Sequence, residues 1–319
     1  MWIYILAACL LLVTELVYFK VAEHFNIIDR PNKRSSHKRI TLRGGGIIFY
    51  FGVLNYFLLY GFVYPWLFAG LTLIAIISFA DDNRPQSSKL RLTVHFVAIF
   101  LMFFQLGLFY MPWYFTLLAL IFCTGVLNAF NFMDGINGMT GGYSMVVIGS
   151  LWYINTYQVS FVDNNLIYIL LLALCIFNIF NFRIKAICFS GDVGAFSIAF
   201  VILFMLVSLI LKAKDVSYII LLGLYGVDTI LTIIHRIMLK DNIFKPHRKH
   251  MYQLMANEMK MPHVLVSGIY CFVQALISVG LIWTESKYWY MLAVILLFST
   301  IYILFMRKYF KLQSLHHVK

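Results

Sequence analysis

Amide and carboxylate side chains recur at a regular spacing where one long apolar stretch of the chain ends. The segment NAFNFMDGING, residues 128–138, follows an apolar run that starts near Trp113. Within it Asn128, Asn131 and Asp134 are three residues apart. A helix that continued through them would carry all three on one face, within about 120° of arc. The spacing therefore predicts a cluster of oxygen donors at one helix end.

Such a cluster suits a divalent metal ion as well as a helix cap. Asn and Asp commonly cap helix ends, but a cap needs fewer polar side chains than this segment carries. Hard oxygen donors suit Mg²⁺, which takes one or two protein ligands and adds water and substrate phosphate. Gly135 and Gly138 allow the backbone to turn and a ligand to come close. The segment is thus a candidate magnesium site.

A pair of adjacent carboxylates follows another apolar run. Asp81 and Asp82 come directly after the run that ends at Ala80. Neighbouring carboxylates repel, and each raises the pKa of the other unless a cation or a basic group lies close. Lys89 and Arg91 follow within one short loop. The pair is either a solvated helix end or, with these basic residues, a site for a metal or a phosphate.

A single carboxylate stands at the start of a third apolar run. In FSGDVGA, residues 189–195, Asp192 lies between Gly191 and Gly194. Gly-Asp is an ordinary turn sequence, so the segment alone is a weak signal. A helix that begins just after it would also favour a bound anion at its N-terminus.

A basic stretch near the C-terminal third, HRKHMYQ, offers two imidazoles and two cations. It spans residues 247–253 and includes His247, Arg248 and His250. Zinc does not fit, because no cysteine or third histidine completes a tetrahedral set. Cationic hydrogen-bond donors suit a pyrophosphate better, although a solvated basic loop would have the same composition.

The elements that must position these residues are membrane-spanning helices. The chain has 319 residues, of which 62% are hydrophobic and 12% charged, against about 25% charged in ordinary soluble domains. Its charge-poor runs approach the roughly 20 residues that cross a bilayer. We predict an all-α polytopic membrane protein, a single integral-membrane domain over residues 1–319. The expected spans number about eleven: 2–22, 45–63, 65–80, 92–108, 113–130, 138–156, 166–182, 193–211, 217–234, 264–284 and 288–305.

The distribution of basic residues gives these spans an orientation. With the N-terminus outside, only Lys212, Lys214 and Lys287 of the 25 Lys and Arg residues fall in outside loops. This is the positive-inside rule, so the net charge of +12 reports topology and gives no support to a nucleic-acid partner. We expect the first span to remain in the protein, because it contains Glu15 and lacks a basic leader. Ten spans instead of eleven would place both chain ends on one side.

The same orientation puts every conspicuous polar segment on the inner face. An enzyme whose substrate arrives from the cytoplasm would show this asymmetry. An alternating-access carrier would more often place polar residues at membrane depth, in broken helices. A carrier for lipid-linked or nucleotide sugars remains the alternative class. It would carry essential ionisable groups within the spans, where Glu15, His95 and Asp228 are the few present.

Taken together, the motifs resemble those of the polyprenyl-phosphate N-acetylhexosamine-1-phosphate transferases. The resemblance covers roughly residues 27–255 and rests on the Asp-Asp pair, the NxxNxxDGxNG segment and the GDxG segment, in the family's order. The stretch PNKRSSHKRITLRGGG looks like the first cytoplasmic loop of the branch that starts O-antigen or capsule units. The family comprises helical membrane enzymes that transfer a sugar-1-phosphate from a UDP-sugar to undecaprenyl or another polyprenyl phosphate, releasing UMP.

The resemblance implies roles for individual residues. Asp192 fits the magnesium-binding aspartate, and Asn131 the asparagine that can share the ion, for which Mn²⁺ could substitute. Asp81, Asp82 and Asp134 are the implied catalytic acids, and a general-base role stays open against positioning of the acceptor or the metal. A single- or a double-displacement route also stays open. The implied substrate-binding residues are Asn128, Asn137, Lys89, Arg91, His247, Arg248 and His250, with Asn137 near the uracil.

One departure from the family bears on the donor sugar. Many relatives carry several histidines in the last large cytoplasmic loop, where this chain has Tyr252 and Gln253. That resembles the subgroup that initiates bacterial surface polysaccharides, with UDP-GlcNAc, UDP-FucNAc or UDP-QuiNAc as donor. Phospho-MurNAc-pentapeptide transfer is the alternative within the enzyme class. The resemblance implies a multi-pass protein of the bacterial inner membrane with its site on the cytoplasmic face. It leaves open whether the protein is a homodimer.

Overall fold

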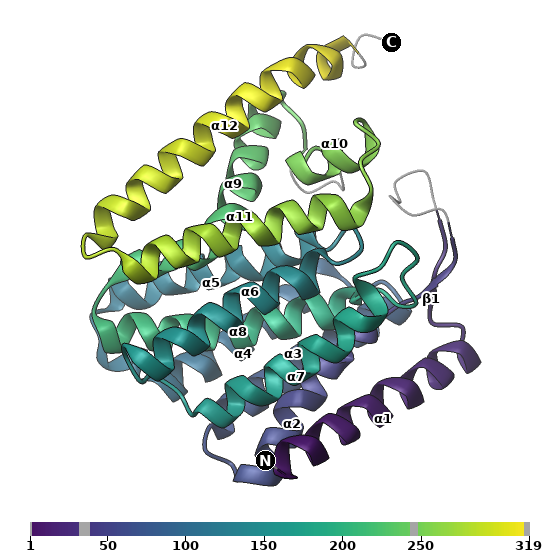
Figure 1. The fold of residues 1–319 in the computed structure, drawn as a ribbon, viewed down its shortest axis with the longest axis vertical. Coiled ribbons are helices and arrows are strands. Elements are labelled where there is room, and N and C mark those ends of the chain that lie inside the picture. Colours follow the sequence, from purple (N-terminus) through teal and green to yellow (C-terminus); the bar gives the residue numbers. More distant parts are fainter. Residues whose placement is uncertain (1, 32–38, 243–247, 316–319) are drawn as a thin grey trace.

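The computed structural model describes residues 2–31, 39–242 and 248–315, the last eight of these by their backbone alone. Most of its long α-helices, such as α1, α7, α8 and α11, run in roughly the same direction across the view of Figure 1, whereas α9 stands steeply to them. The α-helices of the described ranges are α1 Trp2–His24, α2 Ile48–Tyr60, α3 Pro65–Asn83, α4 Ser88–Leu106, α5 Trp113–Met133, α6 Met139–Tyr157, α7 Asn164–Asn181, α8 Gly191–Ala213, α9 Gly223–Met238, α10 Met251–Asn257, α11 His263–Trp283 and α12 Lys287–Leu315.

Short elements complete the fold. They are the 3₁₀ helices η1 Gly45–Ile47, η2 Leu108–Tyr110 and η3 Val216–Leu222, and the two-residue strands β1 Ile28–Asp29 and β2 Thr41–Leu42. The prediction of an all-α polytopic membrane protein is confirmed, because helices occupy each of the eleven predicted spans. Nine segments of the described ranges are long and apolar enough to cross a bilayer. The two remaining predicted spans correspond to the short helix α2 together with η1, and to α6.

Helix α8 is the centre of the bundle. Within the most apolar 18 residues of α8, 94% of the residues are buried inside the protein. The corresponding stretches of α5 and α12 are only 22% buried. A helix that is apolar on all sides can lie either in lipid or among other helices. Here α3, α5, α2 and α6 pack around α8. The position of the Asp192 end of α8 is therefore set by the whole bundle.

The ends of the helices follow local sequence rules. Pro65 occupies the first turn of α3, where its missing N–H costs no hydrogen bond. The hydroxyl of Ser87 accepts the N–H of Leu90 at 3.2 Å and caps α4. At its other end α4 stops at Gly107, which has a φ of 72°, a conformation that glycine adopts without strain. The Ser87 cap starts α4 soon after α3 ends at Asn83, so the loop is short and the acid pair stays near Arg91.

A small backbone ribbon ties the first loop to the start of α8. Strand β1 pairs with β2 in antiparallel register, and Leu42 of β2 forms a parallel bridge with Cys188. The ladder continues as the N–H groups of Gly45 and Gly46 donate to the carbonyl oxygens of Phe189 and Ser190. The residues just after β2 are thereby held against the N-terminus of α8.

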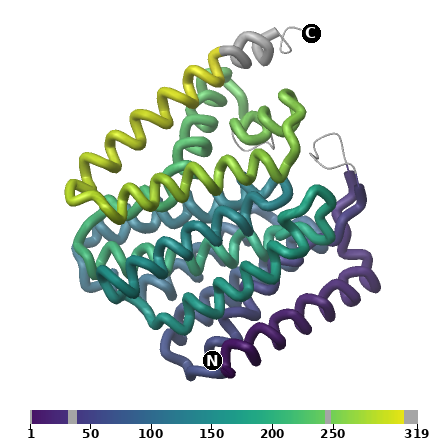
Figure 2. Tube along the Cα trace, in the orientation of Figure 1, coloured from purple at the N-terminus to yellow at the C-terminus, as the bar shows by residue number. Residues whose placement is uncertain are grey.

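The polar loops gather at one end of the bundle. In Figure 1 the β1 ribbon and α10 both lie toward the right, while α1 begins at the opposite end. The trace in Figure 2 shows α12 running back toward the end that carries the ribbon. The start of α1 and the end of α12 therefore lie at opposite ends of the bundle, as an odd number of spans requires.

Candidate active site

The second aspartate of the acid pair caps helix α8. One Asp82 carboxylate oxygen accepts the N–H of Asp192 at 2.9 Å, and the other accepts that of Val193 at 3.0 Å. The Asp82 side chain is fully buried. Its charge also complements the positive end of the α8 dipole. The C-terminus of α3 thereby fixes the position of Asp192.

Arg43 joins Asp82 to Asp192. Its Nε lies 2.6 Å from the Asp82 carboxylate, and its Nη2 lies 3.2 Å from Asp192. Burial opposes the charge of the guanidinium, but the two carboxylates outweigh it and raise the pKa of Arg43. The sequence analysis did not select Arg43. The signal that could have found it is its place directly before Gly44–Gly46, in a basic loop on the same face.

The other half of the cluster is an ion pair between Asp81 and Arg91. Arg91 Nη1 lies 2.6 Å from Asp81 and 3.6 Å from the second oxygen of Asp192. The first oxygen of Asp81 accepts the N–H of Gln86 at 2.6 Å. The structure thus separates the two predicted basic residues, because Arg91 belongs to the acid cluster while Lys89 is exposed on the first turn of α4.

Glycines allow the backbones of this region to meet. A Cβ at Gly194 would overlap the Cα of Gly46. Gly191 has a φ of +71°, and a Cβ there would stand 2.6 Å from the Asp82 carboxylate and 2.8 Å from the backbone of Gly44. A larger residue at either position would push the first loop away from α8.

The 128–138 segment differs in one respect from the sequence-based expectation. Helix α5 ends at Met133, so Asn128 and Asn131 lie on the helix and Asp134 follows it. The chain turns there, with the N–H of Gly135 donating to the Met133 carbonyl oxygen. The physical reason is the glycine-rich sequence after Met133, which favours a turn over a further helical turn.

The Asp134 carboxyl is surrounded by protein atoms, although part of the residue's surface remains exposed. Burial raises the pKa of this carboxyl to about 7, and repulsion from Asp82 adds to the rise while Arg43 opposes it. These interactions place Asp134 within electrostatic reach of the Asp82–Asp192 cluster. The acid pair and Asp192 therefore meet in space, and the interactions of Asp134 indicate that the 128–138 segment ends near them.

The asparagines of the segment have different surroundings. Asn128 donates its amide N–H to the carbonyl oxygen of Thr124, within its own helix, and Asn131 is half-buried. Asn137 is buried, and its amide donates to the carbonyl oxygens of Arg183 and Ile184 at 2.9 and 3.3 Å. Asn137 thus ties this segment to the loop before α8.

The last predicted motif lies against the same segment from the other side. His250 is buried, with its Nδ1 3.4 Å from Asp228 of α9. Arg248 is half-buried, and burial lowers its pKa. Two residues after His250, the Tyr252 hydroxyl donates to the carbonyl oxygen of Phe132 at 2.8 Å. The predicted residue His247 lies outside the described residues.

The donor chemistry of the cluster is compatible with Mg²⁺. Among the described residues, no three Asp, Glu, His or Cys side chains converge as a metal-binding group. Mg²⁺ asks for less, since one or two carboxylates with substrate phosphate and water complete its shell. The Asp192 carboxylate, 16% exposed, is a hard oxygen donor open to the site. It fits as such a ligand.

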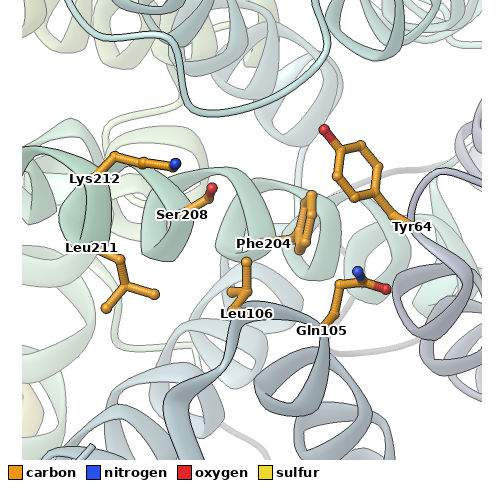
Figure 3. Close-up of a pocket in the computed structure, with 7 residues that line it drawn as sticks. All are labelled: Tyr64, Gln105, Leu106, Phe204, Ser208, Leu211 and Lys212. Atoms are coloured by element: carbon orange, nitrogen blue, oxygen red, sulfur yellow. The ribbon is translucent and has the colours of Figure 1, made fainter. Parts of the chain in front are cut away.

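Two cavities lined by residues of the described ranges lie apart from the acids. A cavity of about 360 Å³ is lined by the side chains labelled in Figure 3, from the start of α3 and the ends of α4 and α8. It includes Tyr64 and Lys212 and lies at the end of α8 away from Asp192. A second cavity, about 550 Å³ and apolar, is lined by Ile184 and by residues 262–272 around α11. It adjoins Asn137, whose backbone carbonyl oxygen accepts the Ser267 hydroxyl.

Comparison with known proteins agrees with this geometry. Residues 64–210 match the model of glycosyl transferase family 4, a range that includes the acid pair, the 128–138 segment and Asp192. A probable undecaprenyl-phosphate N-acetylglucosaminyl 1-phosphate transferase of Bacillus subtilis is 28% identical over 274 residues, covering 77% of this chain and 74% of the relative. The chain is thus similar to the polyprenyl-phosphate N-acetylhexosamine-1-phosphate transferases, over a range that includes the acids of the cluster.

Further relatives of this family match nearly the whole chain. The undecaprenyl-phosphate alpha-N-acetylglucosaminyl 1-phosphate transferase of Escherichia coli O157:H7 is 27% identical over 334 residues, covering 93% of this chain and 89% of the relative. That of Yersinia pestis is 25% identical over 330 residues, covering 91% and 90%. The protein is an integral membrane protein, with several apolar helices long enough to cross a bilayer.

Proposed function

We propose that the protein transfers N-acetylglucosamine-1-phosphate from UDP-GlcNAc to undecaprenyl phosphate and releases UMP. The names of the relatives support the transferred group and the lipid acceptor. The structural observation that carries the proposal is the convergence of Asp82, Asp192 and Arg43 at one end of the bundle. Carboxylates and guanidinium groups placed together there suit a metal-bound diphosphate.

In the proposed reaction an oxygen of the lipid phosphate attacks the sugar-bearing phosphorus of the donor. The bond from that phosphorus to UMP breaks, and a lipid-linked pyrophosphoryl sugar remains. Phosphoryl transfer depends mainly on positioning and on neutralising negative charge. Arg43 and Arg91 hold fixed positive charge beside the carboxylates, where negative charge builds during transfer.

Mg²⁺ is part of this proposal. Asp192 would hold it, with Asn131 as a second oxygen donor, and Mn²⁺ could substitute. When bound, the ion supplies charge neutralisation on the diphosphate. Asp82 keeps Asp192 in place through the α8 amides, and Arg43 keeps both carboxylates together.

The contacts of Asp82 favour a positioning role over a general-base role. Both of its oxygens accept backbone N–H groups, and one also contacts Arg43. A phosphomonoester has a second pKa of about 6, so much of the lipid phosphate is already dianionic at neutral pH. Removing a proton would gain little, and a carboxylate engaged in this way is poorly placed to accept one.

The site would lie where a lipid phosphate and a water-soluble nucleotide can meet. We assign it to the cytoplasmic face of the bacterial inner membrane, because the positive-inside rule places the basic loops there. The apolar cavity beside Asn137 offers a path for an isoprenoid chain next to the polar cluster. The donor is proposed as UDP-GlcNAc on the names of the relatives, with the 6-deoxy sugars as the nearest alternatives.

The test uses purified protein in detergent with undecaprenyl phosphate and Mg²⁺. UDP-GlcNAc, UDP-FucNAc and UDP-QuiNAc are offered separately, and UMP release is followed. We expect release with UDP-GlcNAc that requires the lipid, stops with EDTA and is lost in Asp192→Asn. Asp215→Asn is the matched control, since Asp215 caps η3 at the opposite end of the bundle and asparagine caps equally well. Release with another donor alone would correct the sugar, and none with any donor would contradict the proposal.

A further inference from the structure

Helix α9 carries a buried carboxylate that the proposed reaction does not use. Asp228 is 1% exposed and lies in the middle of an apolar helix. It accepts the hydroxyl of Tyr270 at 2.7 Å and that of Thr232 at 3.2 Å. A buried charge costs much free energy unless hydrogen bonds satisfy it. The contacts of Asp228 therefore indicate what its burial accomplishes.

The remaining contacts of Asp228 all fix the start of helix α10. Its oxygens accept the N–H of Met251 at 3.0 Å and, more weakly, that of Tyr252 at 3.5 Å. The imidazole of His250 lies 3.4 Å away. A helix of seven residues such as α10 is unstable on its own. Its position is consequently set by the carboxylate beneath it.

Helix α10 in turn holds the segment that carries Asn131 and Asp134. Tyr252 is fully buried, and its hydroxyl donates to the carbonyl oxygen of Phe132 at 2.8 Å. A Cβ at Gly135 would overlap that hydroxyl, so the ring fits directly against the turn. Tyr252 therefore connects Asp228 to the backbone on both sides of Met133.

We propose that Asp228 is a positioning residue for the transferase site, acting through α10 and Tyr252 on residues 131–135. The expected effect on kcat/KM rests on the proposed function. The expected effect on the position of residues 131–135 does not. Without the carboxylate, α10 loses its anchor and the Tyr252 hydroxyl no longer holds the Phe132 carbonyl. Asn131 and Asp134 then sample positions away from the acid cluster.

The kinetic test is a double-mutant cycle of Asp228→Asn and Tyr252→Phe. Each single variant loses kcat/KM for UDP-GlcNAc by roughly fivefold, the value of about one hydrogen bond. If both act along one path, the double variant loses no more than the worse single variant. Independent effects would multiply to roughly 25-fold, and that result would overturn the proposal. Tyr252→Phe keeps the test usable if Asp228→Asn folds poorly.

The matched control is Tyr290→Phe. The Tyr290 hydroxyl also donates to a backbone carbonyl oxygen, that of Ile277 at 3.0 Å, and also lies against a glycine, Gly280. It stands between α11 and α12, at the end of the bundle opposite to α10. We expect Tyr290→Phe to keep the wild-type kcat/KM. This variant loses a hydrogen bond of the same kind, but one that does not connect Asp228 to residues 131–135.

Hydrogen–deuterium exchange supplies a readout that needs no activity. Amides of residues 128–140 should exchange roughly fivefold faster in Asp228→Asn and Tyr252→Phe, and at the wild-type rate in Tyr290→Phe. Unchanged exchange in both site variants would overturn the positioning role. Faster exchange in both site variants, together with no UMP release by the wild-type protein, would leave this role standing and remove the proposed function.

Discussion

Asp82 accepts the backbone N–H of Asp192 at 2.9 Å, so one carboxylate of the site holds another in place. The two residues come from the end of α3 and the start of α8, and Arg43 contacts both. The fold itself therefore depends on a residue of the acid pair.

This relationship predicts that Asp82 contributes to stability as well as to activity. Asp82→Ala removes a cap worth about 1 kcal/mol and leaves Arg43 without its nearest partner, for a total loss of about 2 kcal/mol. Asp82→Asn should lose less, because its amide oxygen can still accept one N–H. Thermal unfolding in detergent measures both, and an Asp82→Ala protein with the wild-type Tm would contradict the capping role.

A second prediction concerns the contact between the first loop and α8. Gly194→Ala introduces a methyl group that would overlap Gly46, and overpacking of this kind costs about 1–3 kcal/mol. Gly149→Ala is the control, because a Cβ there meets nothing within 4 Å and alanine favours a helix. We expect a lower Tm only for Gly194→Ala. Equal Tm values would show that the two backbones do not pack as described.

A third prediction separates the two basic residues after the acid pair. Arg91 contacts Asp81 and Asp192, whereas Lys89 is exposed. Arg91→Ala should lower kcat/KM by at least about tenfold, since it removes charge-assisted contacts of the reacting cluster. Lys89→Ala should stay within about threefold, as expected of a solvated charge. Steady-state kinetics on both variants decides this, and a greater loss for Lys89→Ala would contradict the arrangement.

A fourth prediction follows from the raised pKa of Asp134. Its pKa of about 7 lies above its ordinary value of 3.8, so the folded protein keeps this proton at pH values where the unfolded chain has lost it. The stabilisation is complete below pH 3.8 and is lost as the pH rises through 7. In EDTA the wild-type free energy of unfolding should therefore fall between about pH 4 and pH 7. Asp134→Asn should show a shallower fall, and parallel curves would contradict the shift.

The apolar runs were sufficient to predict the helices, because crossing a bilayer demands long charge-poor segments. The charge asymmetry likewise oriented the polar segments toward one end. Helix α10 escaped prediction, since its seven residues are stabilised by Asp228, far away in sequence. The end of α5 before Asp134 also differed from a continuous helix, because the glycines that follow favour a turn.

The site was predicted in its motifs but not in its contacts. Asp81, Asp82 and Asp192 stood out as polar residues beside apolar runs. Arg43 did not, because its partner Asp192 is 149 residues away. The β2–Cys188 bridge and the backbone hydrogen bonds that follow it bring the two together. The substrate-binding roles of Asn128 and Asn137 stay predictions. Asn137 also carries a structural task, through its hydrogen bonds to the loop before α8.

The most direct test of the central claim follows the β-phosphate of the donor. UDP-GlcNAc labelled with ³²P at this phosphate is incubated with the purified protein, undecaprenyl phosphate and Mg²⁺, and the products are partitioned between organic and aqueous phases. Transfer of the sugar together with its phosphate predicts that the label enters the lipid phase while unlabelled UMP stays in water. Label left in water as UDP, with sugar alone in the lipid, would contradict the account.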